Sequence, residues 1–185
     1  PDVQRDRKEI KVELSEGQKS ALKELNKHLG DARMAHRRGS ANVDACRAIS
    51  PNSFAGVPES EHESIAKKLQ GSIGILKSSA INRIINSHPD NAKVRAAVQM
   101  VKDRAGKQGV IFARNKASVE QYKAALEKEG KRVVVITGSD SAKDKDKKRR
   151  LFNPESGDAQ ADVLISSDAG AVGMNLQSGQ YLIQH

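Results

Sequence analysis

The stretch VLISSDAGAVGMNLQ, residues 163–177, decides the fold that we expect for this chain. It begins with an apolar run and changes abruptly at Ser-Ser-Asp into small, polar and glycine-containing sequence. A continuous apolar run without alternation is typical of a strand that is covered on both faces, as in a parallel sheet. The stretch therefore predicts a buried strand whose carboxyl end opens onto a polar loop.

The second half of the chain repeats this arrangement. Further apolar runs of strand length lie at 109–113, 132–136 and 181–184. Helical patterns separate them: Ser118 and Gln121 form a possible capping box, Gly130 stands where a helix should end, and Ser141 precedes a charged helix. Alternating strands and helices predict parallel strands joined by right-handed crossovers. The fold class is therefore α/β, with helices flanking a parallel sheet.

The first half of the chain is mainly helical in pattern. The alternating run at 10–14 predicts a strand, and Ser15 with Gln18 forms a capping box that opens a helix. Residues 39–60 have the composition of a loop, and the glycines within 71–74 predict a break between two helices.

Two domains follow from these patterns. Residues 1–104 form a mainly helical run-in, and residues 105–185 form a partial α/β lobe.

Composition narrows the classes of partner. The 185 residues include 32 Lys and Arg against 23 Asp and Glu, a net charge of +9, which favours an anionic partner such as nucleic acid over a plain basic protein. The one cysteine, Cys46, excludes an intrachain disulfide and suits a reducing compartment. No apolar run approaches the roughly 18 residues of a membrane span, so we expect no membrane partner.

The loops after three of the strands have a common chemistry. In a parallel sheet the carboxyl ends meet at one edge, so the loops at 114–118, 137–141 and 166–177 should share a rim. They are rich in Arg, Lys, Asn, Ser, Thr and Gly, which offer cations, hydroxyls and accessible amides to phosphate oxygens. The alternative is that these polar residues only cap helices, as in any loop between a strand and a helix. Three such loops in a basic chain favour a phosphate-binding edge.

Several catalytic motifs are absent from the sequence. It contains no G-x-x-x-x-G-K-[ST] loop, no G-x-G-x-x-G, no H-E-x-x-H and no cysteine pair. The five histidines, His185 among them, are scattered and are interpreted as surface residues. The Lys–Asp alternation within 142–152 is interpreted as a solvated helix face with internal pairing. These features argue against a self-sufficient nucleotide hydrolase, a dinucleotide enzyme and a metal site.

A family resemblance becomes visible on this framework. The segments GKQGVIFARNKASVEQYKAAL (106–126), VVVITGSDSAKDKDKKRRLFN (133–153) and ADVLISSDAGAVGMNLQSGQYLIQH (161–185) resemble successive motifs of the C-terminal RecA-like lobe of superfamily-two helicases and translocases, in the Swi/Snf-related branch. The last segment carries the most specific match, because Ser-Asp-Ala-Gly and Gly-x-Asn-Leu-Gln agree in order and spacing.

The resemblance implies a function and roles for particular residues. It implies the second motor lobe of an ATP-dependent translocase or helicase-like protein on double-stranded DNA, which grips the DNA backbone and closes over ATP and Mg²⁺ held mainly by a first RecA-like lobe. The residues implied to contact DNA are Asn115, Lys116, Thr137, Gly138, Ser166 and Ser167. Those implied to link DNA contact to the ATP cleft are Gly170, Gly173, Asn175 and Gln177.

The sequence also departs from the family pattern. Thr137 stands where relatives commonly have an acid, and the sequence ends at His185, before the motif that carries the arginine finger. With no initiator Met at Pro1, we expect a piece of a longer protein. Lacking a Walker lysine and an arginine finger, the piece should contain no catalytic residue and be inactive alone.

Two other readings stay open. A stand-alone nucleic-acid-binding module without ATPase activity would keep the fold and the rim but not the motor. A remote α/β enzyme, such as a nucleotide-sugar transferase or methyltransferase, is disfavoured by the missing cofactor loop. The expected location is the cytoplasm of a prokaryote or phage-infected cell, or the nucleus if the source is eukaryotic.

Overall fold

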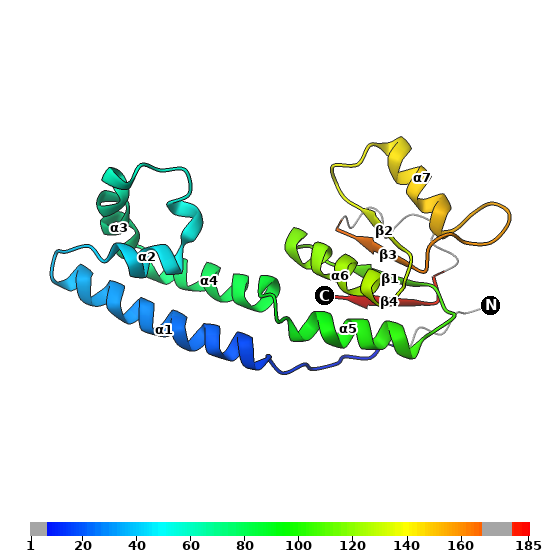
Figure 1. Ribbon diagram of the computed structural model, residues 1–185, viewed down its shortest axis with the longest axis horizontal. Helices are drawn as coiled ribbons and strands as arrows, with labels where there is room; N and C mark the ends of the chain where they lie inside the picture. The colour runs from blue at the N-terminus through cyan, green and yellow to red at the C-terminus, as the bar shows by residue number, and fades with distance from the viewer. Residues whose placement is uncertain (1–6, 168–178) are drawn as a thin grey trace. The chain divides into compact units, whose positions relative to one another are not determined.

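Figure 1 shows the computed structural model of the chain, which describes residues 7–167 and 179–185. Contacts divide the chain into two compact units. One comprises Ala92–His185 with the described part of Pro1–Leu14 and contains the sheet. The other, Ser15–Asn91, is helical. The helix Ala92–Asp103, assigned from sequence to the run-in, belongs to the sheet unit because its valines pack into the core of that unit.

The sheet unit has the predicted parallel α/β architecture. Its described elements, in chain order, are α5 (Ala92–Asp103), β1 (Gly109–Phe112), α6 (Lys116–Lys128), β2 (Val133–Ile136), α7 (Ala142–Phe152), β3 (Val163–Ser166) and β4 (Tyr181–Gln184). The four described strands are all parallel, in the spatial order β2-β3-β1-β4. All four predicted strands are confirmed, and β3 is buried along its whole length as its apolar run predicted.

Helices cover both faces of this sheet, as Figure 1 shows. On one face, α5 and α6 pack against β1 and β3 through a cluster that includes Val101, Leu126 and Ile165. On the other face, Phe152 of α7 packs with a smaller cluster that includes Leu164. The strand β4 is only half covered, because its burial alternates along the strand.

A close contact between two strands of the sheet explains why position 109 is a glycine. Gly109 of β1 pairs with Tyr181 of β4, and a Cβ added to Gly109 would lie 2.0 Å from the Tyr181 ring. The ring therefore occupies the space that any larger residue at position 109 would need. The guanidinium of Arg104 lies over the same ring, 5.6 Å from its centroid.

In the sheet unit, the start of α7 and the end of α6 lie where the sequence predicted them, and the start of α6 does not. Ser141 caps α7, accepting a hydrogen bond from the Asp144 amide, and Gly130 follows α6 with a φ of 77°, as a C-terminal cap requires. The predicted capping box at Ser118 is wrong. The helix α6 begins earlier, since Asn115 caps it through a hydrogen bond from the Ala117 amide, and Ser118 is buried inside the helix.

The helical unit packs around its own apolar core. Its elements are α1 (Glu16–Arg37), α2 (Val43–Ile49), the short 3-10 helices η1 (Pro51–Ser53) and η2 (Glu59–Glu61), α3 (His62–Gln70) and α4 (Ile73–Ser87). The predicted capping box is confirmed: the Ser15 hydroxyl accepts from the Gln18 amide, and the Gln18 side chain accepts from the Ser15 amide. Leu25 and Leu29, on one face of α1, are buried in the core.

Two predictions for the first half are wrong and one is confirmed. Residues 10–14 form no strand, because they pair with no other segment in the described part of the chain and Ile10 remains 48% exposed. The predicted loop at 39–60 contains α2, whose buried Cys46 and Ile49 join the core. The predicted break at 71–74 is confirmed, since α3 ends at Gln70 and α4 begins at Ile73. In the described residues no helix is both long and apolar enough to span a bilayer.

Candidate nucleic-acid interface

The carboxyl ends of the strands form one rim. The last residues of three adjacent strands lie side by side in register: Ile136 of β2, Ser166 of β3 and Phe112 of β1. Hydrogen bonds continue the ladder past the strand ends: the Ala113 amide donates to the Ser166 carbonyl at 3.0 Å, and the Ser167 amide donates to the Ile136 carbonyl at 3.1 Å. The loops that follow β2, β3 and β1 therefore start next to one another, as the sequence predicted.

The loop after β1 presents positive charge. Asn115 and Lys116, both predicted to contact DNA, are exposed at the start of α6. The Asn115 side chain is engaged as the helix cap, with its Oδ1 2.8 Å from the Ala117 amide. Sequence reasoning did not select Arg114, which is exposed beside them. Neither Arg114 nor Lys116 forms an ion pair within the described residues, so both cations remain available to an anion at the beginning of a helix.

The turn after β2 is closed by an acid. The Asp140 carboxylate accepts hydrogen bonds from the Thr137 amide at 2.8 Å and from Lys148 Nζ at 2.9 Å. The Thr137 hydrogen bond, helped by Lys148, holds the pKa of Asp140 below its usual value. The Thr137 amide is thus used inside the turn. Gly138 is exposed with open space where a side chain would be, so its backbone is the accessible part of this loop.

The two serines after β3 differ in exposure. Ser166 is fully buried, which argues against direct contact between its side chain and DNA. Ser167 is partly exposed at the rim. The four residues predicted to link DNA contact to the ATP cleft, Gly170, Gly173, Asn175 and Gln177, lie outside the described residues.

The charges on α7 pair with one another, as the sequence predicted. Asp146 accepts from Arg149 at 2.8 Å and from Arg150 at 2.9 Å, and the hydrogen bond from Arg149 is the largest cause of its lowered pKa. Lys148 is held by Asp140. These pairs reduce the positive charge that α7 could offer to a polyanion.

A histidine at the end of β4 is not the plain surface residue that the sequence indicated. His185 Nδ1 is hydrogen-bonded to the Tyr122 hydroxyl of α6, and the two rings meet edge to face at 5.5 Å. Burial, together with the positive charge of Lys93, lowers the pKa of His185. Burial raises the pKa of the Tyr122 hydroxyl. His185 is therefore favoured in its neutral form.

This pair predicts a pH dependence of stability. The unfolded chain should protonate His185 near its ordinary pKa of 6.5, whereas the folded chain resists protonation to a lower pH. The unfolded state then binds more protons, so the contribution of His185 is full above about pH 6.5 and declines as the pH falls toward the lowered folded value. Urea unfolding at pH 7.5 and 5.5 should show this decline, and the variant His185→Asn should reduce it. An equal decline in both proteins would contradict the prediction.

The sequence of the sheet unit matches a known family. Residues 92–185, half of the chain, match the helicase conserved C-terminal domain. The chain belongs to that family. None of the curated proteins has a sequence that matches this chain significantly.

Solved structures share its fold. The C-terminal part of the Fun30 ATPase domain is 15% identical, with a TM-score of 0.54 over 94% of this chain and 72% of its own length. The C-terminal domain of the SWI2/SNF2 ATPase from Sulfolobus solfataricus is 17% identical, with a TM-score of 0.52, and the alignment covers 75% of this chain and 64% of that domain. The predicted RecA-like fold, preceded by a helical segment, is confirmed by these likenesses.

Proposed function

We propose that this helicase C-terminal domain is the second motor lobe of an ATP-dependent translocase that moves on double-stranded DNA. The observation that supports it most directly is the rim, where the loops after β1, β2 and β3 begin side by side. Its partners would be the DNA duplex and a first RecA-like lobe.

The chemistry of the rim suits a nucleic-acid backbone. Arg114 and Lys116 offer two cations without ion-pair partners in the described residues, and Ser167 and the Gly138 backbone add polar groups along the same edge. Groups of this kind hold phosphates and position a protein without reading base edges. The proposed DNA contact should therefore be insensitive to sequence and weakened by salt.

The ATP side of the proposal concerns other residues. The described part of the chain contains no group of three or more His, Cys, Asp or Glu side chains that could hold a metal ion. The residues proposed to link DNA contact to the ATP cleft lie outside the described residues: Gly170, Gly173, Asn175 and Gln177. We expect the chain alone not to hydrolyse ATP, because the sequence contains no Walker lysine.

A charge-matched pair of variants tests the rim. The double variant Arg114→Gln/Lys116→Gln should weaken binding of duplex DNA and reduce the slope of log affinity against log salt by about two, because each lost cation removes roughly one phosphate contact. Fluorescence anisotropy with two unrelated duplex sequences at several salt concentrations measures both quantities.

The control removes the same charge from the opposite edge of the sheet. Lys107 and Lys128 are exposed, next to the amino end of β1 and at the end of α6. The double variant Lys107→Gln/Lys128→Gln should leave the salt slope unchanged. Equal losses in the two double variants would overturn the rim as the DNA site. The second candidate, a stand-alone binding module, is tested by fusing to the chain both a first lobe and a segment that carries the arginine-finger motif. DNA binding at the rim without DNA-stimulated ATPase activity in that fusion would favour the binding module.

A further inference from the structure

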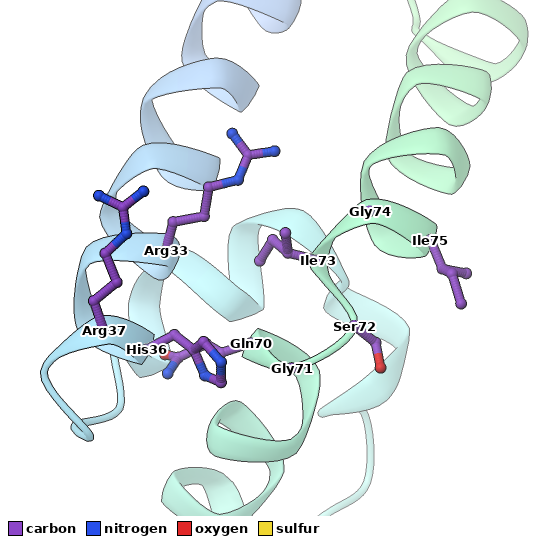
Figure 2. Close-up of a pocket in the computed structure, with 9 residues that line it drawn as sticks. All are labelled: Arg33, His36, Arg37, Gln70, Gly71, Ser72, Ile73, Gly74 and Ile75. Atoms are coloured by element: carbon purple, nitrogen blue, oxygen red, sulfur yellow. The ribbon is translucent and has the colours of Figure 1, made fainter.

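The helical unit contains a basic pocket that the proposed motor function does not use. The pocket has a volume of about 450 Å³ and lies between the end of α1 and the bend from α3 to α4. Figure 2 shows residues that line it: Arg33, His36 and Arg37 come from α1, and Gln70, Ile73 and Gly74 come from the end of α3 and the start of α4.

The charged residues that line the pocket are all basic. No acidic residue lines the pocket, and Arg33 and Arg37 stand one helical turn apart, so their side chains leave the same face of α1. Both side chains are exposed, and neither has an ion-pair or hydrogen-bond partner within the described residues. Like charges four positions apart on one helix face repel one another, and an anion between the two guanidinium groups would relieve this repulsion. Guanidinium groups bind phosphate and carboxylate oxygens with paired hydrogen bonds.

The start of α4 adds backbone donors. Ser72 precedes this helix but makes no capping hydrogen bond with its side chain, which points away from Arg33 in Figure 2. The first amides of α4 are therefore not capped by a side chain. No atom lies within 4 Å of the position that a Cβ would take at Gly74, so a ligand can approach the backbone there. Uncapped amides at a helix start attract anions.

A buried glutamine holds the two sides of the pocket together. Gln70 is only 3% exposed; its Nε2 donates to the Ser40 carbonyl and its Oε1 accepts from the Asn42 amide, both at 2.8 Å. These bonds tie the end of α3 to the segment that follows α1. The arginines and the start of α4 are thus presented on a fixed frame, which reduces the conformational entropy lost on binding.

We infer that this pocket binds a phosphate group through Arg33, Arg37 and the first amides of α4. A phosphate offers several oxygens, enough for two guanidinium groups and a helix start at once, whereas a carboxylate offers two. The phosphate could belong to the DNA backbone or to a free polyphosphate. The DNA source rests on the proposed function, and the recognition of phosphate does not.

The first test uses pyrophosphate as the probe and the full chain. In a titration followed by amide chemical shifts, resonances at the start of α4 and the end of α1 should move in the wild-type protein. The variant Arg33→Gln/Arg37→Gln should bind pyrophosphate at least about tenfold more weakly, because charge-assisted hydrogen bonds are lost. The matched control Lys23→Gln/Lys27→Gln removes the same charge with the same spacing from exposed positions of α1 and should bind as the wild type does.

A second variant separates binding from folding. In Gly74→Glu a carboxylate enters the first turn of α4, where it favours the helix and has room, yet it repels phosphate. This variant should be at least as stable as the wild type to thermal unfolding without ligand, and it should lose pyrophosphate binding. Normal pyrophosphate binding by Gly74→Glu and by the double arginine variant would overturn the inference.

Duplex DNA distinguishes the two sources. If the pocket takes backbone phosphate, Arg33→Gln/Arg37→Gln should also weaken DNA binding and lower its salt slope by about two, while Lys23→Gln/Lys27→Gln does not. If only pyrophosphate binding is lost, the pocket serves a free polyphosphate and the inference still holds. If DNA does not bind the chain at all while pyrophosphate does, the proposed function fails and the pocket stands. If Arg33→Gln/Arg37→Gln binds both pyrophosphate and DNA as tightly as the wild type does, the inferred pocket is refuted and the proposed function is not affected.

Discussion

Replacing Phe152 with alanine should lower the free energy of unfolding of the sheet unit by about 3–5 kcal/mol. Phe152 has no exposed surface and is the buried residue through which the described helix α7 joins the core. Its ring packs with Val110, Ile136 and Leu164 of three different strands. Alanine would remove this burial and leave a cavity that the β-sheet backbone cannot close.

Urea unfolding and hydrogen exchange of the strand amides measure this loss. The variant Lys147→Ala changes an exposed residue of the same helix and should alter stability by less than about 0.5 kcal/mol. A loss below about 1 kcal/mol in Phe152→Ala would mean that α7 is not anchored through this ring.

The substitution Phe152→Ala should also disturb the turn after β2, at the rim of the sheet. Lys148 of α7 holds Asp140, and Asp140 closes the turn that contains Thr137 and Gly138. If α7 no longer packs on the sheet through Phe152, Lys148 moves away from Asp140. The Asp140 carboxylate then keeps its hydrogen bonds from Thr137 but loses the one from Lys148. The stability of α7 on the sheet and the shape of one proposed DNA-contacting loop are therefore linked through a single ion pair.

The sheet was predictable because its signal is local. Each strand contains a continuous apolar run, such as 163–165, and a run of this kind is typical of a strand that is covered on both faces. Alternation with helices then leaves few topologies apart from a parallel sheet. The rim followed from this topology alone, since parallel strands end at one edge.

Features that depend on contacts between distant segments could not be predicted in this way. Ser118 and Asn115 are both good capping residues, and only the burial of Ser118 in α6 decides between them. His185 gave no signal of burial, because its partner Tyr122 lies 63 positions away. The basic pocket was missed for the same reason: Arg33 and Gly74 meet only when α1 and α4 pack together.

Leu29 is the second position where we expect a large effect, in the helical unit. It is 1% exposed and belongs to a core whose other buried members include the alanines Ala32, Ala45, Ala66 and Ala80. Small side chains let the helices approach closely but contribute little apolar area, so the few leucines and isoleucines carry much of the burial. Leu29→Ala should therefore lower the free energy of unfolding of this unit by about 2–5 kcal/mol.

Alanine favours helices more than leucine does, so the loss should come from packing and not from α1 itself. Two variants separate these causes: Leu29→Met keeps most of the volume and should cost less than about 1.5 kcal/mol, and Lys27→Ala tests helix propensity at an exposed position. Hydrogen exchange of α1 and α4 amides reports the change where it occurs. If Leu29→Ala and Lys27→Ala leave these amides equally protected, the core around Leu29 does not hold α1 against α4.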